Sequence, residues 1–147
     1  MGRPNRTPLV RAIVKVYTDG ASRGNPGPAA IGVVVCDADE TVLREHREHI
    51  GEATNNEAEY RAIIAGLDLA SKFTRKEIVC TTDSELVVRH LAGSYRLKSD
   101  RMRALFSRVK EKEGRFERVS FRHRPRLTGH LRRADELANE ALDEAGF

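Results

Sequence analysis

The feature that most constrains this chain is a strand-like run that ends in an aspartate and a glycine-rich turn. Residues 13–17 are mostly β-branched or aromatic, the pattern of a strand buried on both faces. Asp19 follows this run. Gly20, Gly24 and Gly27, with two prolines, predict that the backbone turns away directly afterwards. Open α/β sheets place their chemistry at such strand ends, so we expect Asp19 at the rim of a sheet. The alternative is that it only initiates a turn.

Size and composition favour one soluble domain. The 147 residues are 39% hydrophobic, and we find no apolar tract long enough to span a membrane. Residues 1–11 are predicted to form a disordered basic arm, and residues 12–147 the folded domain. Because no apolar signal segment follows the basic start, we expect a cytoplasmic protein with no membrane partner. Cys36 and Cys80 lie in apolar runs, which indicates small buried side chains rather than a redox pair or a metal site.

The charges are segregated along the chain, although the net charge is only +4. Residues 94–112 carry seven Lys or Arg against two acids, and residues 115–133 carry seven Arg against one Glu. The last fourteen residues hold five acids and no base. A solvated surface would mix the two signs, so this pattern favours a face that binds a polyanion, with nucleic acid as the first candidate.

Hydrophobic periodicity and turn residues predict the element order βββαβααβα. Strands are expected at about 12–19, 31–36, 41–50, 78–82 and 119–121, and helices at about 56–73, 84–91, 101–112 and 132–145. This order indicates an α/β or α+β domain with a mixed five-stranded sheet.

Four acids stand at element boundaries from which their side chains can converge: Asp19, Glu59, Asp83 and Asp135. Glu59 lies on the apolar side of the first helix, Asp83 ends the fourth strand, and Asp135 is expected to open the last helix. Helix-start and capping roles are the alternatives. Glu57 is expected to be an ordinary first-turn acid. Four converging carboxylates need counter-cations, and oxygen ligands favour Mg²⁺ or Mn²⁺.

Four motifs in this order resemble those of type 1 ribonuclease H: residues 17–28 (YTDGASRGNPGP), 54–59 (TNNEAE), 82–84 (TDS) and 134–138 (ADELA). The resemblance spans nearly all of residues 12–145. It implies a ribonuclease H-like fold with strand order 3-2-1-4-5, in which only the second strand runs against the others and helices cover both faces. Cys36 and Cys80 would then be separated by the first strand, too far apart for a disulfide.

The resemblance also implies an activity, namely hydrolysis of the RNA strand of RNA–DNA hybrids by two-metal-ion catalysis, which leaves 5′-phosphate and 3′-hydroxyl ends. The implied ligands of Mg²⁺, with Mn²⁺ as a substitute, are Asp19, Glu59, Asp83 and Asp135. The implied substrate contacts are Gly24, Asn25, Thr54, Asn55 and Asn56, for which turn and cap chemistry is the alternative. The alternative functions are an inactive module that binds hybrids or double-stranded RNA, and another ribonuclease H-like nuclease. We expect a monomer without an obligatory protein partner.

Two departures from the family pattern affect these expectations. The chain has no Trp and only a short segment at 93–98, which indicates the shorter variant without the basic protrusion. Hybrid binding would then rely on Arg96, Lys98, Arg101 and the basic segment before the last helix. The family often has a mobile histidine ahead of the last carboxylate. His130, which follows Gly129, is our candidate for that catalytic role, with an ordinary surface residue as the alternative.

Overall fold

The computed structural model describes residues 11–93, 97, 99–125 and 129–147. The predicted basic arm, apart from Arg11, lies outside these residues, as do Arg96, Lys98 and Arg126. The strands are β1 (Ile13–Ser22), β2 (Gly27–Asp37), β3 (Val42–Ala53), β4 (Glu77–Thr82) and β5 (Arg118–His123). The helices are α1 (Asn55–Ala70), α2 (Glu85–Leu91), α3 (Asp100–Glu113) and α4 (Gly129–Glu144). The predicted element order is confirmed.

The five strands form one mixed sheet in the order β3-β2-β1-β4-β5. β2 pairs antiparallel with both β1 and β3, whereas β4 pairs parallel with both β1 and β5, so β2 alone runs against the others. The sheet topology and strand directions that the resemblance implied are therefore confirmed. Cys36 on β2 and Cys80 on β4 are both free and buried, with β1 between their strands, as expected.

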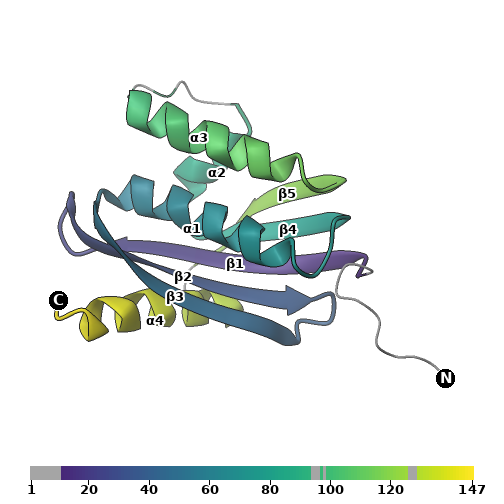
Figure 1. Ribbon diagram of the computed structural model, residues 1–147, viewed down its shortest axis with the longest axis horizontal. Helices are drawn as coiled ribbons and strands as arrows, with labels where there is room; N and C mark the ends of the chain where they lie inside the picture. Colours follow the sequence, from purple (N-terminus) through teal and green to yellow (C-terminus); the bar gives the residue numbers. More distant parts are fainter. Residues whose placement is uncertain (1–10, 94–96, 98, 126–128) are drawn as a thin grey trace.

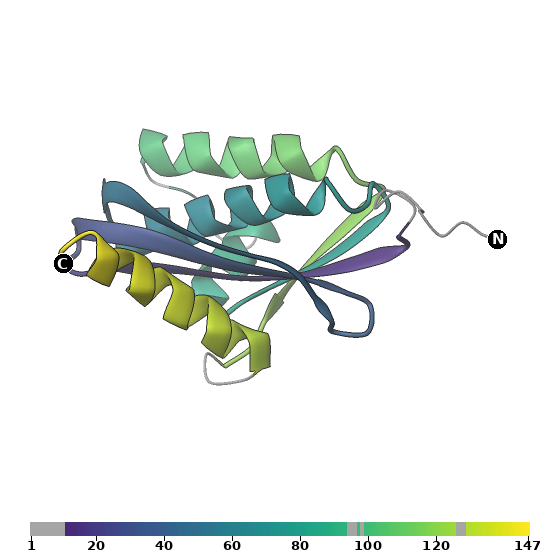
Figure 2. The ribbon, with the colours of Figure 1, turned by 60° about the horizontal axis from the view of Figure 1, so that its bottom comes forward.

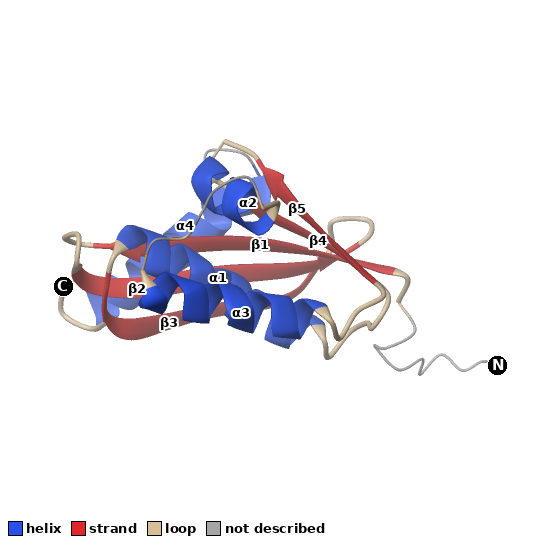
Figure 3. Ribbon diagram, turned by 90° about the horizontal axis from the view of Figure 1, so that it is seen from above, coloured by secondary structure: helices blue, strands red, loops and turns tan. Residues whose placement is uncertain are grey.

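Helices cover both faces of the sheet. Figure 1 shows α1, α2 and α3 on one face and α4 alone on the other. Successive residues of β2 alternate between these two layers: Val33 and Val35 belong to the core cluster that includes Ile63 and Leu67 of α1, whereas Val34 and Cys36 pack with residues of α4. Seen from above, α3 lies against α1 (Figure 3). Because both faces of β1 and β2 are covered, these strands are apolar along most of their length.

The first two strands are longer than predicted. β1 continues past Asp19 to Ser22, because Gly20, Ala21 and Ser22 keep pairing with β2. Glycine retains both backbone hydrogen-bonding groups, so it weakens a strand without preventing it. The prediction that the chain turns directly after Asp19 was wrong. The parallel pairing of β1 with β4 nevertheless stops at Thr18 and Thr82, so Asp19 lies where the two strands separate.

Two glycines next to Asp19 let helices approach the sheet closely. A Cβ on Gly20 would lie 2.3 Å from the carbonyl carbon of Ala58 in α1, on one face. A Cβ on Gly32, the β2 residue opposite Asp19, would lie 2.0 Å from the carbonyl oxygen of Ala134 in α4, on the other. Figure 2 shows α4 crossing the sheet on its own face. Both helices therefore reach the sheet at the position of Asp19.

Within the part of the chain that the structure describes, no helix is both long and apolar enough to cross a lipid bilayer.

Candidate active site

Three of the four predicted carboxylates meet at the point where β1 and β4 separate. Asp19 comes from β1, Glu59 from the first turns of α1, and Asp83 directly follows β4. One carboxylate oxygen from each lies within 4.8 Å of the other two. Asp19 is 1% exposed and Glu59 is 7% exposed, whereas Asp83 is partly exposed. Asp19 and Glu59 therefore form the buried part of this group, and Asp83 is its solvent-accessible member.

The surroundings of Glu59 favour the protonated form of its carboxyl group. Its Oε1 accepts a hydrogen bond of 2.9 Å from the backbone N–H of Gly20. Burial, together with the neighbouring charges of Asp19 and Asp83, raises the pKa of Glu59 well above its ordinary value. A cation bound between these oxygens would remove that repulsion. The donor set consists of carboxylate oxygens, which fits a hard divalent cation such as Mg²⁺ or Mn²⁺.

The raised pKa of Glu59 predicts how stability depends on pH when no metal is bound. From the ordinary pKa of 4.5 up to the raised value, the folded protein keeps a proton that the unfolded chain releases. The contribution of Glu59 to the free energy of unfolding therefore falls as pH rises through this window. Urea unfolding in EDTA should show wild type losing stability relative to Glu59→Gln as the pH is raised above 4.5. A stability difference that does not change with pH contradicts this account.

Asp135 approaches the same place from the opposite face of the sheet. It lines a cavity of about 430 Å³ together with Asp19, Gly20, Glu59 and Asn139. Its carboxylate is not part of the group of three within 4.8 Å. The prediction that Asp135 opens the last helix was wrong, because α4 begins at Gly129 and Asp135 lies in its second turn. The close contact at Gly32 brings this turn onto the sheet.

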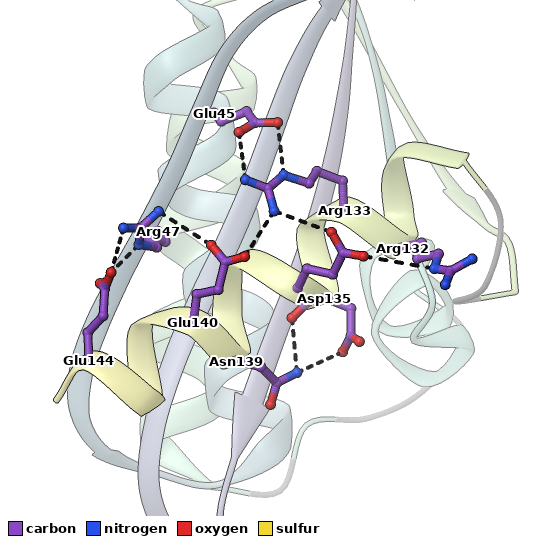
Figure 4. A network of polar contacts seen from close by, with 9 residues as sticks. Glu45, Arg47, Arg132, Arg133, Asp135, Asn139, Glu140 and Glu144 are labelled. Carbon is purple, nitrogen blue, oxygen red and sulfur yellow. Dashed lines mark hydrogen bonds and ion pairs between the residues drawn. The ribbon is translucent and has the colours of Figure 1, made fainter. Parts of the chain in front are cut away.

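Asn139 is a candidate site residue that sequence reasoning missed. Its amide nitrogen donates to the Asp135 carboxylate at 3.3 Å and to the Asp135 carbonyl oxygen at 3.0 Å (Figure 4). Its own amide oxygen accepts from Arg23 at 3.3 Å. Its position four residues after Asp135 could have indicated this role, because residues spaced by four lie on the same face of a helix. Asn139 therefore links the turn after β1 to Asp135.

An ion-pair network fastens α4 to β3 (Figure 4). Arg133 makes two hydrogen bonds of 3.0 Å with the carboxylate of Glu45, and these bonds raise the pKa of the arginine. The same guanidinium pairs with two acids of its own helix, Glu136 and Glu140. On β3, Arg47 pairs with Glu140 and Glu144. Arg133 belongs to the segment predicted to bind a polyanion, but these acids already neutralise its charge.

Of the residues predicted to contact substrate, Asn55 lines the same cavity as three of the carboxylates. The backbone N–H of Asn55 donates to the Asn25 side chain at 3.0 Å, which ties the turn between β1 and β2 to the start of α1. Thr54 caps this helix, and Asn55 and Asn56 are exposed in its first turn. Gly24 has a φ of +127°, which L side chains rarely adopt, so the turn needs glycine there.

Glu57 has more partners than an ordinary first-turn acid. It is 6% exposed and accepts from the backbone N–H of Thr54 at 2.8 Å, completing a capping box. Its other oxygen pairs with Arg101 of α3 at 3.1 Å. A neighbouring cavity of about 320 Å³ is lined by these two residues together with Arg61 and Arg108. The start of α1 therefore lies beside a concentration of arginines.

The structure does not place His130 in a loop. It lies in the first turn of α4, and that part of the sequence prediction was wrong. Its Nε2 is 3.1 Å from the carbonyl oxygen of Glu40, and its ring centroid is 5.1 Å from that of Tyr17. The catalytic prediction depended on the freedom of a loop, so this position gives it no support. His123, at the end of β5, is exposed beside Arg122 and Arg124.

Comparison with known proteins identifies relatives over most of the chain. Residues 17–141 match the family model described as reverse transcriptase-like. Ribonuclease HI of Halobacterium salinarum is 46% identical over 132 residues, which is 90% of this chain and 65% of that protein. The bifunctional protein Rv2228c of Mycobacterium tuberculosis is 44% identical over 133 residues, and the chain spans 36% of its length. Ribonuclease H of Halorhodospira halophila is 34% identical, covering 91% of this chain and 95% of that protein.

Solved structures show the same similarity in three dimensions. RNase H1 from Halobacterium salinarum has a TM-score of 0.85 at 44% identity, covering 90% of this chain and 98% of that one. LC11-RNase H1, solved in complex with an RNA/DNA hybrid, has a TM-score of 0.84 at 40% identity, with the same coverage of both chains.

Proposed function

This chain belongs to the ribonuclease H family and has its fold, and on that basis we propose that it is an endonuclease that hydrolyses the RNA strand of RNA–DNA hybrids. The observation that carries this proposal is the group of three carboxylates of Asp19, Glu59 and Asp83, whose oxygens lie within 4.8 Å of one another. A relative of similar structure has been solved with an RNA/DNA hybrid, which supports the choice of substrate.

Asp19, Glu59, Asp83 and Asp135 would hold two Mg²⁺ ions, with Mn²⁺ as a substitute. When bound, such a pair supplies a hydroxide nucleophile and stabilises the departing 3′-oxygen, which leaves 5′-phosphate and 3′-hydroxyl ends. The protein contributes the arrangement of the ligands. Gly20 orients Glu59 through its N–H group, and Asn139 orients Asp135 through its side-chain amide. The network around Arg133 keeps α4, and with it Asp135, against the sheet.

Asn25, Asn55 and Asn56, with the backbone at Gly24, would recognise the RNA strand beside the carboxylates. Amide side chains and backbone groups can both donate to and accept from a 2′-hydroxyl, the group that distinguishes RNA from DNA. Thr54 would bind a phosphate of the DNA strand at the start of α1, where helix N–H groups favour anions. Arg101 lies next to this position, because the buried carboxylate of Glu57 holds its guanidinium there.

Arg101 gives a prediction about hybrid affinity. Its side chain is 76% exposed, so the guanidinium has donors left for a phosphate. With Ca²⁺ in place of Mg²⁺ to prevent turnover, binding should weaken steeply as salt rises, and Arg101→Ala should reduce the slope of log Kobs against log salt by about one. Arg47→Ala is the matched control, since Arg47 already pairs with Glu140 and Glu144. If the salt dependence of log Kobs has the same slope in both variants, Arg101 does not contact the hybrid.

An inactive module that binds hybrids is the main competing function, and one experiment separates it from an enzyme. Hybrid binding is measured in EDTA, and RNA cleavage is then followed after Mg²⁺ is added. We expect binding in both conditions and cleavage only with Mg²⁺. Binding without cleavage in either Mg²⁺ or Mn²⁺ would favour the inactive module. We also propose that residues 12–147 act as a monomer, which sedimentation of the hybrid complex would test.

A further inference from the structure

A second cluster of potential ligands lies on the α4 face of the sheet, away from the carboxylates. Cys36 near the end of β2, Glu40 in the turn that follows, and His130 in the first turn of α4 each offer an atom within 4.8 Å of the other two. Cys36 pairs with Lys15, which precedes Asp19 by four residues on β1. At ~3.3 Å per residue, this cluster lies roughly 13 Å along the strand from Asp19.

The carboxylate and the imidazole of this cluster are spaced like two ligands of one metal ion. In a tetrahedral site with bonds of about 2.0–2.3 Å, the ligand atoms lie roughly 3.3–3.8 Å from one another. Oε1 of Glu40 is 3.6 Å from Nε2 of His130, which is within this range. Cys36 is fully buried, whereas the side chains of Glu40 and His130 are 43% and 27% exposed. The sulfur therefore forms the floor of a cluster that is open to solvent on one side.

Neighbouring side chains hold these ligands in position. The hydroxyl of Tyr17 donates to Oε1 of Glu40 at 2.6 Å, and Lys15 donates to Oε2 at 2.7 Å. The Tyr17 ring also packs against the ring of His130, with centroids 5.1 Å apart. Metal ligands in proteins are oriented by hydrogen bonds of this kind, so the carboxylate and the imidazole need little rearrangement to share an ion.

We propose that Cys36, Glu40 and His130 bind a divalent transition-metal ion of the Zn²⁺ type. Sulfur, nitrogen and oxygen together are the donors that Zn²⁺ takes, whereas the carboxylate group at Asp19 offers only oxygen and suits Mg²⁺. A bound ion deprotonates a coordinating thiol, so the buried cysteine binds as a thiolate. The ion joins β2, the following turn and α4, and leaves a fourth position for water.

Co²⁺ is the probe for this site, because thiolate ligands give it a charge-transfer absorption in the near ultraviolet that oxygen ligands do not. The titration uses the full chain carrying Asp19→Asn, because this substitution weakens Co²⁺ binding at the carboxylate group of Asp19, Glu59 and Asp83. We expect the absorption to saturate at one Co²⁺ per chain and to be displaced by Zn²⁺, which binds such donors more tightly. Cys36→Ala should abolish it, and His130→Ala should weaken Co²⁺ binding at least tenfold.

The chain offers a matched control for each variant. Cys80 is the other buried cysteine and lies on β4, and His123 is an exposed histidine on β5. Neither Cys80→Ala nor His123→Ala should change the titration. The proposal is overturned if the folded Asp19→Asn chain shows no charge-transfer absorption, or if that absorption survives Cys36→Ala. If Cys36→Ala does not fold, melting temperatures provide the test instead. Zn²⁺ should raise the melting temperature of the Asp19→Asn chain. An equal rise after His130→Ala is added would overturn the proposal.

Discussion

Asp19→Asn is expected to abolish Mg²⁺-dependent cleavage of RNA–DNA hybrids while the protein stays folded. Asp19 is 1% exposed, and one of its carboxylate oxygens lies within 4.8 Å of oxygens of Glu59 and Asp83. Its negative charge would therefore contribute directly to binding an ion between the three residues. Turnover should fall by at least ~10³-fold, because removing even one neutral donor from a charge-stabilising site costs ~10²–10³. Without metal, the free energy of unfolding should be unchanged or higher by about 1 kcal/mol, since one of three crowded charges is removed.

The measurement combines single-turnover cleavage at saturating enzyme with urea unfolding in EDTA. Asp39→Asn is the control, because it removes the same charge from an exposed position in the turn between β2 and β3. It should leave both quantities near those of wild type. If Asp19→Asn retains a tenth or more of the wild-type rate, Asp19 is not a metal ligand. A marked loss of stability would contradict the repulsion that we assign to the carboxylate group.

Gly32→Ala is expected to have the largest effect on stability. Its Cβ would lie 2.0 Å from the carbonyl oxygen of Ala134 and 2.9 Å from the backbone nitrogen of Ala138, so α4 must move away from the sheet. Overpacking of this kind costs about 3 kcal/mol. The same movement displaces Asp135, which follows Ala134 directly, and turnover should therefore fall even at temperatures where the variant remains folded.

Gly114→Ala is the control for the added methyl group. Gly114 caps the C-terminus of α3 with a φ of −64°, and its Cβ would lie 3.4 Å from the carbonyl oxygen of Glu111, an ordinary van der Waals contact. We expect a change below about 0.5 kcal/mol there. Thermal and urea unfolding of both variants make the comparison. Equal stabilities for Gly32→Ala and Gly114→Ala would contradict the close contact between α4 and β2.

The three clustered carboxylates could be predicted because each follows from local pattern. Strand-like runs end at or next to Asp19 and Asp83, and Glu59 shares the apolar side of an amphipathic helix. Parallel strands joined by a helix bring such positions to one edge of a sheet. The strand order and the cysteine separation came from the resemblance, and the structure confirmed both. The roles assigned to the site residues stay predictions until the variants are measured.

The errors concern features that depend on contacts between distant segments. β1 runs past Asp19 because β2 supplies hydrogen-bonding partners, which no local pattern in the glycine-rich segment reports. Glu57 is buried and pairs with Arg101, which lies forty-four residues later in the chain. Cys36 is a different case, because it is buried as predicted, and only its proximity to His130 depends on the packing of α4 on the sheet. Sequence spacing predicts which residues lie on one face of a helix or strand, but not which distant segment packs against that face.

The most direct test of the proposed function is cleavage of four substrates by the wild-type chain in Mg²⁺. An RNA–DNA hybrid, an RNA duplex, a DNA duplex and single-stranded RNA of the same sequence are labelled at the 5′ end of every strand, and the product ends are mapped. We predict cleavage within the RNA strand of the hybrid alone, with 5′-phosphate and 3′-hydroxyl products and no reaction in EDTA. An intact hybrid in both Mg²⁺ and Mn²⁺, or cleavage of its DNA strand, would contradict the function proposed for the carboxylates at Asp19, Glu59, Asp83 and Asp135.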